Sequence, residues 1–306
     1  MSWDYTRPPL LGIDVSHHNG GLDMPAIRAA GISFVICKVT EGTGFQDHLW
    51  PTYRQMVQAD ENIVLGAYHF LKANTSVVAQ VDYFLETLGT DPAPLLLCLD
   101  VELDLNNLGP TYAQVVEWVE TFRDRLPGHP LLLYSGGWYW RDYLSNVNAT
   151  ALECDLWDSQ YVSGTGSPAY LLSKVIPTVW TPYGGWTLDT RPIRQYSASG
   201  VIGSMTSVDL DAFWGTKDQL LAYTQEAKMT DAQLSALLDA LAALSGKLDA
   251  TNATLAQLTK LVTQGRNASF RHSITNALLN DDEATAKTLQ EAADGLGIVT
   301  GFKPTV

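Results

Sequence analysis

The sequence predicts an α/β protein folded as a closed barrel of mainly parallel strands. Short apolar runs that suit buried strands alternate with stretches whose apolar residues recur at helical spacing, and this alternation favours a parallel sheet. About eight such strand segments fall within roughly 215 residues, a number that suits a barrel. Several of these runs are followed by an acidic residue, at the strand ends where a barrel carries its active site.

The expected elements follow one another regularly over the first half of the chain. Strands are expected at 10–16, 32–39, 63–70, 95–102 and 131–134. Helices are expected at 24–30, 49–60, 76–88, 112–126 and 138–144. The helix at 112–126 also has Gly109-Pro110 before it and Pro127-Gly128 after it, which are common start and stop signals.

The pattern changes after Trp157, where the helical periodicity fades. Three short strand-like pieces remain, at 178–180, 192–196 and 207–210, and they are separated by Gly and Ser. This final part therefore predicts a barrel that is closed by strands with few helices between them.

The stretch at 95–102 carries the strongest chemical signal. Five apolar residues run into Asp100 and Glu102, whose side chains point to the same side of a strand. Their Cβ atoms lie roughly 6–7 Å apart, which allows either the retaining carboxyl separation of glycosidases (about 5–5.5 Å) or the inverting one (about 6.5–9.5 Å). The simpler alternative is a polar strand end with one acid capping the next helix.

Further acids follow other strands of the expected barrel. Asp14 follows the first strand, and Asp209 and Asp211 lie near the last. Because the first and last strands of a closed barrel are neighbours, Asp14 and Asp209 should meet, with Asp100 and Glu102 across the mouth. Repulsion and partial desolvation raise the pKa of at least one acid in such a group, which is the requirement of glycoside hydrolysis.

Aromatic residues at the same strand ends support a sugar substrate. Pyranose rings present C–H faces that stack on aromatic rings, and tyrosine hydroxyls reach their polar edges. Any one of these residues taken alone is better explained as a core or rim aromatic. The set that clusters at the expected strand ends is Tyr68, Tyr134, Trp157, Tyr161 and Tyr196.

Five motifs resemble glycoside hydrolase family 25, the lysozymes (N-acetylmuramidases) common in bacteria and phages. They occur in the same order over residues 10–215: GIDVS at 12–16, GAYHF at 66–70, LDVE at 99–102, QYS at 195–197 and VDLD at 208–211. The resemblance implies a modified TIM-like (β/α)5(β)3 barrel. It also implies cleavage of the β-1,4 bond between N-acetylmuramic acid and N-acetylglucosamine with retained configuration.

The resemblance also implies roles for single residues. Glu102 would be the general acid/base, and Asp100 would orient the substrate acetamide or stabilise the intermediate that it forms. Asp14 and Asp209 would shape and charge the site. Whether the acetamide or a carboxylate is the nucleophile stays open. The residues expected to bind substrate are Tyr68, Tyr134, Trp157, Tyr161, Gln195, Tyr196 and Asp211.

Two segments depart from the family pattern. His17-His18 stands where the family often has an aromatic residue and a Gln. The stretch 156–161 (LWDSQY) departs from the commoner Leu-Trp-Ile-Ala-x-Tyr form. These departures concern the sugar subsites rather than the acid pair.

Composition limits the partners. The net charge is −14 with a pI near 4.7, so nucleic acid and anionic membranes are poor partners. No apolar run is long enough to predict membrane insertion, and the first nine residues do not resemble a classical signal peptide. The three cysteines show no zinc spacing, and Cys37 and Cys98 fall in strand-like runs, where reduced core thiols are expected.

The composition divides the chain into four parts. We expect a catalytic barrel at 1–216, a linker at 217–228, a coiled-coil helix at 229–265 and a small helical module of unreadable role at 266–306. Leucines at spacings of three and four form an a/d heptad pattern over four heptads of the third part, with one polar interruption at Thr251. This seam favours a homo-oligomer, and the alternative is a helix packed on the enzyme domain.

Two other functions remain as alternatives. A metal hydrolase could use Asp14, His17, His18 and His69, but their spacing matches no familiar ligand motif, so neither a metal nor another cofactor is expected. A non-catalytic wall-binding or phage structural protein on a barrel scaffold is the second alternative. The favoured interpretation is a phage endolysin that is held in the host cytoplasm until release and then acts on bacterial peptidoglycan.

Overall fold

Eight strands close into a barrel in this computed structural model, which describes residues 3–224 apart from 90, 91 and 93. In ring order the strands are β1 (Leu10–Val15), β2 (Ile32–Glu41), β4 (Val64–Phe70), β5 (Leu96–Asp100), β6 (Leu132–Gly136), β7 (Asp155–Ser159), β8 (Ile193–Ile202) and β9 (Met205–Phe213). Neighbours from β1 to β8 are parallel, whereas β9 runs antiparallel to both β8 and β1. The short β3 (Phe45–Gln46) adds to β2.

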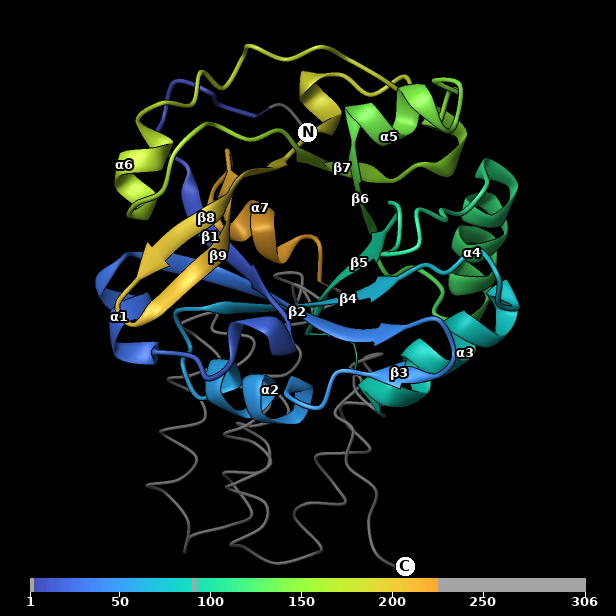
Figure 1. Ribbon diagram of the computed structural model, residues 1–306, viewed down its shortest axis with the longest axis horizontal. Helices are drawn as coiled ribbons and strands as arrows, with labels where there is room; N and C mark the ends of the chain where they lie inside the picture. Colours follow the sequence, from blue (N-terminus) through green and yellow to red (C-terminus); the bar gives the residue numbers. More distant parts are fainter. Residues whose placement is uncertain (1–2, 90–91, 93, 225–306) are drawn as a thin grey trace, which may run out of the picture. The chain divides into compact units, whose positions relative to one another are not determined.

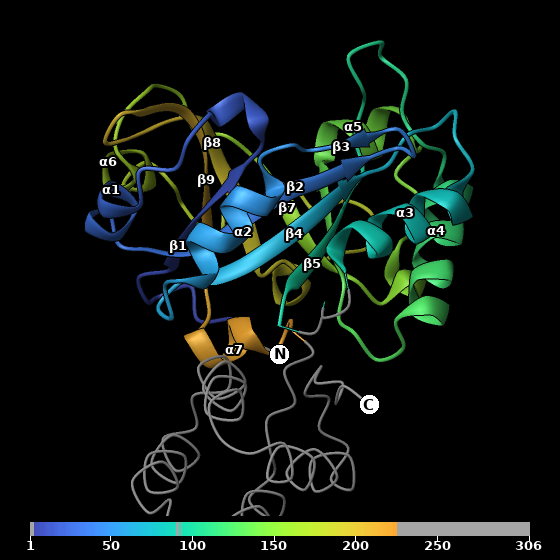
Figure 2. The same cartoon turned by 90° about the horizontal axis from the view of Figure 1, so that it is seen from below.

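Helices follow the first five barrel strands and lie outside them (Figures 1 and 2). They are α1 (Met24–Ala29), α2 (Trp50–Gln58), α3 (Val77–Leu88), α4 (Tyr112–Arg125) and α5 (Gly137–Asp142). The five-residue α6 (Pro168–Leu172) is the one α-helix that the structure places between β7 and β8, and no element lies between β8 and β9. The expected arrangement of five strand–helix units followed by three strands is therefore confirmed.

One expected strand is wrong. Residues 178–180 form a loop, in which Val179 is exposed. The aromatic character of this segment has another cause, because the Trp180 ring lies 4.8 Å from the buried Arg191 guanidinium. Arg191 also forms an ion pair with Asp158 (3.2 Å), so Trp180 covers a buried charge instead of extending the sheet.

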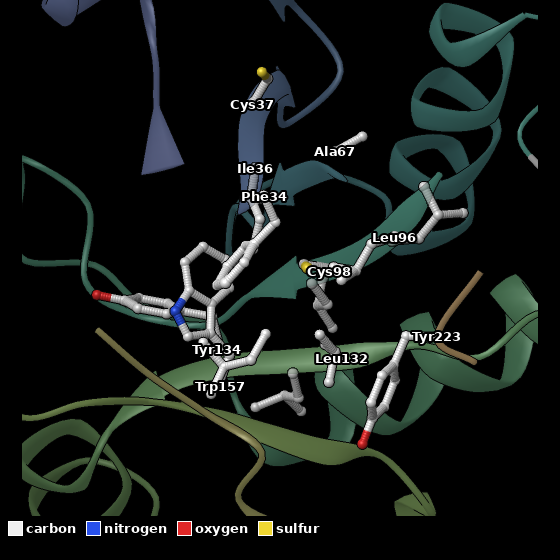
Figure 3. Packing of buried hydrophobic residues seen from close by; sticks show 14 of the residues in the cluster. Phe34, Ile36, Cys37, Ala67, Leu96, Cys98, Leu132, Tyr134, Trp157 and Tyr223 are labelled. Carbon is white, nitrogen blue, oxygen red and sulfur yellow. The ribbon is translucent and has the colours of Figure 1, made fainter. Parts of the chain in front are cut away.

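The barrel interior and the layer beneath the helices form one apolar core. Large aromatic side chains fill much of it, including Phe34, Trp118, Phe122, Tyr134 and Trp157. Figure 3 shows Tyr134 and Trp157 side by side, with ring centroids 4.7 Å apart. Cys37 and Cys98 are buried free thiols in this core, as expected.

The described unit extends beyond the expected barrel end at residue 216. Helix α7 (Lys217–Leu221) lies at the start of the expected linker, and Leu220 and Tyr223 are buried. The Tyr223 hydroxyl donates a hydrogen bond to Asp155 at the start of β7. The rest of the linker, the coiled-coil segment 229–265 and the module 266–306 lie outside the described residues. No helix in the described part of the chain is long and apolar enough to span a membrane.

His69 is held neutral outside the barrel by its packing against α3 and α4. Its ring stacks on Trp118, its Nδ1 lies 2.7 Å from Thr40 Oγ1, and its Nε2 lies 3.1 Å from Gln80 Oε1. Burial lowers the pKa of His69 to about 4.

We predict that this histidine makes the fold sensitive to acid. Its folded pKa lies below the unfolded value, so it contributes stability above pH 6.5 that is lost as the pH falls towards 4, by about 3 kcal/mol. Urea unfolding of the wild type and of His69→Gln at pH 7, 5.5 and 4 measures this loss. The variant should lose less stability over this range, and equal losses in the two proteins would contradict the assignment.

Candidate active site

Four carboxyl groups gather at the mouth of the barrel, where the parallel strands have their carboxyl ends. Asp14 on β1 pairs in register with Asp209 on β9, because β9 closes the ring against β1. Asp100 ends β5, and Glu102 follows two residues later. The charges of all four act on the Tyr68 hydroxyl, which places that side chain among them. The structure thus brings Asp14, Asp209, Asp100 and Glu102 together across one mouth, as expected.

Burial makes these acids hold their protons to unusually high pH. The pKa of Glu102 is raised to about 7 by burial, with a further rise from Asp209 and an opposing effect of Lys38. Burial raises the pKa of Asp209 to about 7 as well. The pKa of Asp100 is raised well above its ordinary range, first by burial and then by the charge of Glu102.

Lys38 is a site residue that the sequence analysis missed. It lies on β2, is 8% exposed, and its Nζ is 2.7 Å from Glu41 Oε2 and 4.8 Å from the Phe70 ring centroid. Its positive charge lowers the pKa of both Asp100 and Glu102. The sequence feature that could have identified Lys38 is that it is the single lysine within the apolar run at 32–39.

A hydrogen-bonded chain links Asp14 to two of the expected tyrosines. Gln195 Nε2 donates to Asp14 Oδ2 (2.6 Å), and Gln195 Oε1 accepts from the hydroxyls of Tyr134 (2.8 Å) and Tyr161 (2.7 Å). Gln195 and Tyr134 are buried, whereas Tyr161 is about half exposed. Tyr161 is therefore the member of this chain that reaches the solvent.

Asp211 lies beneath this chain, with no exposed surface. Its Oδ1 accepts a hydrogen bond from Trp157 Nε1 (2.7 Å), and its carboxyl is hydrogen-bonded to that of Asp14. Two carboxyl groups can bond to each other only when one of them carries a proton. Burial raises the pKa of both carboxyls, and their mutual hydrogen bond raises that of Asp14 further, so the pair holds that proton at neutral pH. Asp211 and Trp157 thus support Asp14 from below, while their expected contact with substrate stays a prediction.

Tyr68 and Tyr196 differ in where their side chains lie. Tyr68 is half-buried at the mouth, with its ring edge-on to Trp157. Tyr196 follows Gln195 in β8, and neighbouring residues of a strand face opposite sides. Its hydroxyl donates to Pro168 O beside α6, so Tyr196 packs outside the barrel and was wrongly expected in the site.

The histidines considered as metal ligands have other partners. His17 Nδ1 lies 3.0 Å from the buried Asp47 Oδ2, its ring contacts that of His18, and His69 is enclosed between β4 and the outer helices. Within the described part of the chain, no group of three or more His, Cys, Asp and Glu side chains could hold a metal ion.

The geometry suits acid-assisted hydrolysis. Glu102 is half-buried at the mouth and titrates near neutral pH, so it can both give and take a proton. Asp100 Oδ1 is buried and makes no hydrogen bond within the described structure, so it can accept one from a bound molecule. This combination fits cleavage of a glycosidic bond, in which a carboxylic acid protonates the leaving oxygen.

Comparison with known proteins agrees with this chemistry. The family model described as glycosyl hydrolases family 25 matches residues 13–203. Lysozyme M1 of Streptomyces globisporus is 31% identical over 223 residues, which cover 69% of this chain and 70% of that protein. An N,O-diacetylmuramidase of Arthroderma benhamiae is 28% identical over 227 residues, covering 70% of this chain and 86% of its own length.

Solved structures show the same fold. The bacterial lysozyme from Streptomyces coelicolor is 27% identical with a TM-score of 0.58, and it covers 71% of this chain and 97% of its own. The muramidase from Trichobolus zukalii is 26% identical with a TM-score of 0.57, covering 71% of this chain and 99% of its own.

We predict that Asp211 lowers the stability of the fold as the pH rises. Between its ordinary pKa of 3.8 and about 8, the folded protein keeps a proton that the unfolded chain has released, so stability falls with rising pH. Asp211→Asn removes one of the two titrating carboxyls and should make the fall shallower by up to about 1.4 kcal/mol per pH unit. Urea unfolding at pH 5, 6, 7 and 8 measures the slopes.

The control for this prediction is Asp218→Asn, which changes an exposed acid on α7. Its slope should match that of the wild type. If the Asp211→Asn slope also matches the wild type, the raised pKa of Asp211 is wrong.

Proposed function

The chain belongs to glycosyl hydrolases family 25, and from this premise we propose that it cleaves the β-1,4 bond between N-acetylmuramic acid and N-acetylglucosamine with retention. Its coarser activity, the hydrolysis of peptidoglycan by a lysozyme, follows from the family and from the lysozyme and muramidase relatives. The observation that carries the finer proposal is Glu102, a carboxyl with a pKa of about 7 that lies beside the buried Asp100.

Glu102 acts first as an acid and then as a base. Its proton moves to the glycosidic oxygen as the bond between that oxygen and the anomeric carbon breaks, and the leaving sugar departs as an alcohol. The resulting Glu102 carboxylate then takes a proton from the water that attacks the anomeric carbon. Burial raises the pKa of Glu102 to about 7, while Lys38 lowers it and Asp209 raises it, so both steps are accessible near neutral pH.

Asp100 assists the substrate's own acetamide group. We propose that the acetamide oxygen bonds to the anomeric carbon as the leaving group departs, and that water later opens this ring, which gives net retention. The supporting feature is Asp100 Oδ1, which is buried and makes no hydrogen bond within the described structure. This oxygen can accept a hydrogen bond from the acetamide N–H of the substrate. The N–H becomes a stronger donor as its amide acquires positive charge.

We predict that Glu102→Gln lowers kcat by about 10²- to 10⁴-fold, because the amide keeps the shape of the side chain and removes the transferable proton. The wild-type kcat/KM should fall as the pH rises above about 7, where Glu102 loses its proton. The measurement is release of new reducing ends from purified peptidoglycan, with mass spectrometry to identify the terminal sugar and NMR to follow its first anomer.

Glu120→Gln, on the exposed face of α4, is the control and should behave as the wild type. Full activity of Glu102→Gln would refute the proposed acid. A new reducing end on N-acetylglucosamine, or an inverted first anomer, would refute the bond or the stereochemistry.

We further propose that the chain is a phage endolysin whose segment 229–265 joins several catalytic barrels. The support comes from the sequence, in which a peptidoglycan hydrolase is followed by leucine heptads. Joined barrels would bind the wall through several weak contacts at once. In this role the enzyme stays in the host cytoplasm until the membrane is opened.

We predict that the full chain has a mass in solution of at least twice 33.5 kDa, at a whole multiple of that value. A chain shortened to residues 1–224 should be a monomer, because it lacks the heptads. Light scattering coupled to size-exclusion chromatography measures both. A monomeric full chain would refute joining through 229–265 and would leave the catalytic assignment unaffected.

A further inference from the structure

Trp138 is a large aromatic residue exposed beside the site, and none of the roles above includes it. It lies in the first turn of α5, directly after β6, and its side chain is 43% exposed. Its indole folds back over the strand end. A Cβ atom placed on Gly136 would lie 2.4 Å from Trp138 Nε1 and 3.2 Å from Ser159 Oγ, so the indole lies over the last residues of β6 and β7.

The alternation of side chains along β6 and β7 shows that the Trp138 indole lies at the barrel mouth. Gly136 and Tyr134 are two residues apart in β6 and therefore face the same side, and Tyr134 faces Gln195 inside the barrel. Ser159 shares a face with Trp157 on β7, and Trp157 reaches Asp211 inside the barrel. The indole thus lies one layer above Tyr134 and Trp157, at the open end that carries the acids.

Neighbouring aromatic rings hold the indole in place. Trp138 packs edge-on against Tyr139 (5.7 Å between centroids) and against Tyr143 (6.1 Å). Tyr139 is buried, and its hydroxyl donates to Pro110 O (2.7 Å). The charge of Glu102 acts on Tyr139, so this aromatic group is next to the proton donor. A fixed, partly exposed indole beside the acids is suited to stack on a flat apolar surface.

We propose that Trp138 is a stacking platform for a pyranose ring of the glycan strand, next to the pair of sugars that is cleaved. This inference rests on the proposed function. The C–H face of a sugar is the ligand surface that matches an exposed aromatic ring. The indole lies over the ends of β6 and β7, the strand ends that face the mouth, and a polymeric substrate must continue beyond the bond that is broken. A residue of the stem peptide is the competing occupant.

Gly136 is required for this platform. The position that its Cβ would take is already filled by the indole, at 2.4 Å from Nε1 and 2.6 Å from Cδ1. An alanine there is compatible with the backbone, whose φ is −100°. Gly136→Ala should therefore move the indole and weaken the platform without removing Trp138.

The test compares steady-state kinetics on glycan strands freed of their stem peptides. Trp138→Ala should raise KM about 5- to 10-fold and change kcat less than 2-fold, since one stacking contact is worth about 1 kcal/mol. Trp138→Phe should retain most of the affinity, and Gly136→Ala should resemble Trp138→Ala. The matched control is Tyr170→Ala, which removes an exposed aromatic from α6, on the outside of β8, and should leave KM unchanged.

Binding of the Glu102→Gln variant to the same strands separates this inference from the proposed function. Glu102→Gln should bind them, and the added Trp138→Ala change should weaken binding 5- to 10-fold. Unchanged KM and binding in the Trp138 variants, in an enzyme that still requires Glu102, would overturn the platform alone. An effect seen with intact peptidoglycan but absent with peptide-free strands would assign Trp138 to the stem peptide and also overturn the proposal.

Discussion

The antiparallel pairing of β9 with β1 is the constraint on which the site depends. It closes the ring and sets Asp14 opposite Asp209, so two acids from distant parts of the sequence meet at the mouth where β5 delivers Asp100. The surrounding strands are apolar, and the acids are therefore desolvated. Desolvation is the largest cause of the raised pKa of Glu102, which means that the same closure builds the fold and prepares the proton donor.

This arrangement has an energetic consequence. Because the pKa values of Asp209 and Asp211 are raised, the free energy of unfolding decreases as the pH rises. Because the pKa of the buried His69 is lowered, the free energy of unfolding also decreases as the pH falls. Together the two effects limit the pH range in which the fold is stable, the acids at high pH and His69 at low pH. The acids at the mouth are thus retained at the expense of stability, a common feature of active sites.

Much of the fold and the acid set could be predicted from the sequence, because both depend on local patterns. An apolar run that ends in Asp100 and Glu102 identifies a buried strand and its chemistry together. Tyr196 was misplaced because adjacency to Gln195 in a motif does not show which of the two faces the barrel interior. Residues 178–180 were misassigned because Trp180 covers the buried guanidinium of Arg191, a contact that the local sequence pattern does not show. Lys38 and Trp138 were missed because their roles depend on neighbours brought by other strands.

The hydrogen bonds of Gln195 determine which hydrogen bonds Tyr161 can form at the barrel mouth. Its amide oxygen takes up the single hydroxyl hydrogen of Tyr134 and of Tyr161. While it donates to Gln195, the hydroxyl of the half-exposed Tyr161 has only lone pairs left, so it can accept from a sugar hydroxyl or an amide N–H but cannot donate to a carbonyl. Tyr161 therefore acts at the mouth as a hydrogen-bond acceptor only. Asp14 sets this property through two successive hydrogen bonds, because it orients the Gln195 amide that accepts from Tyr161.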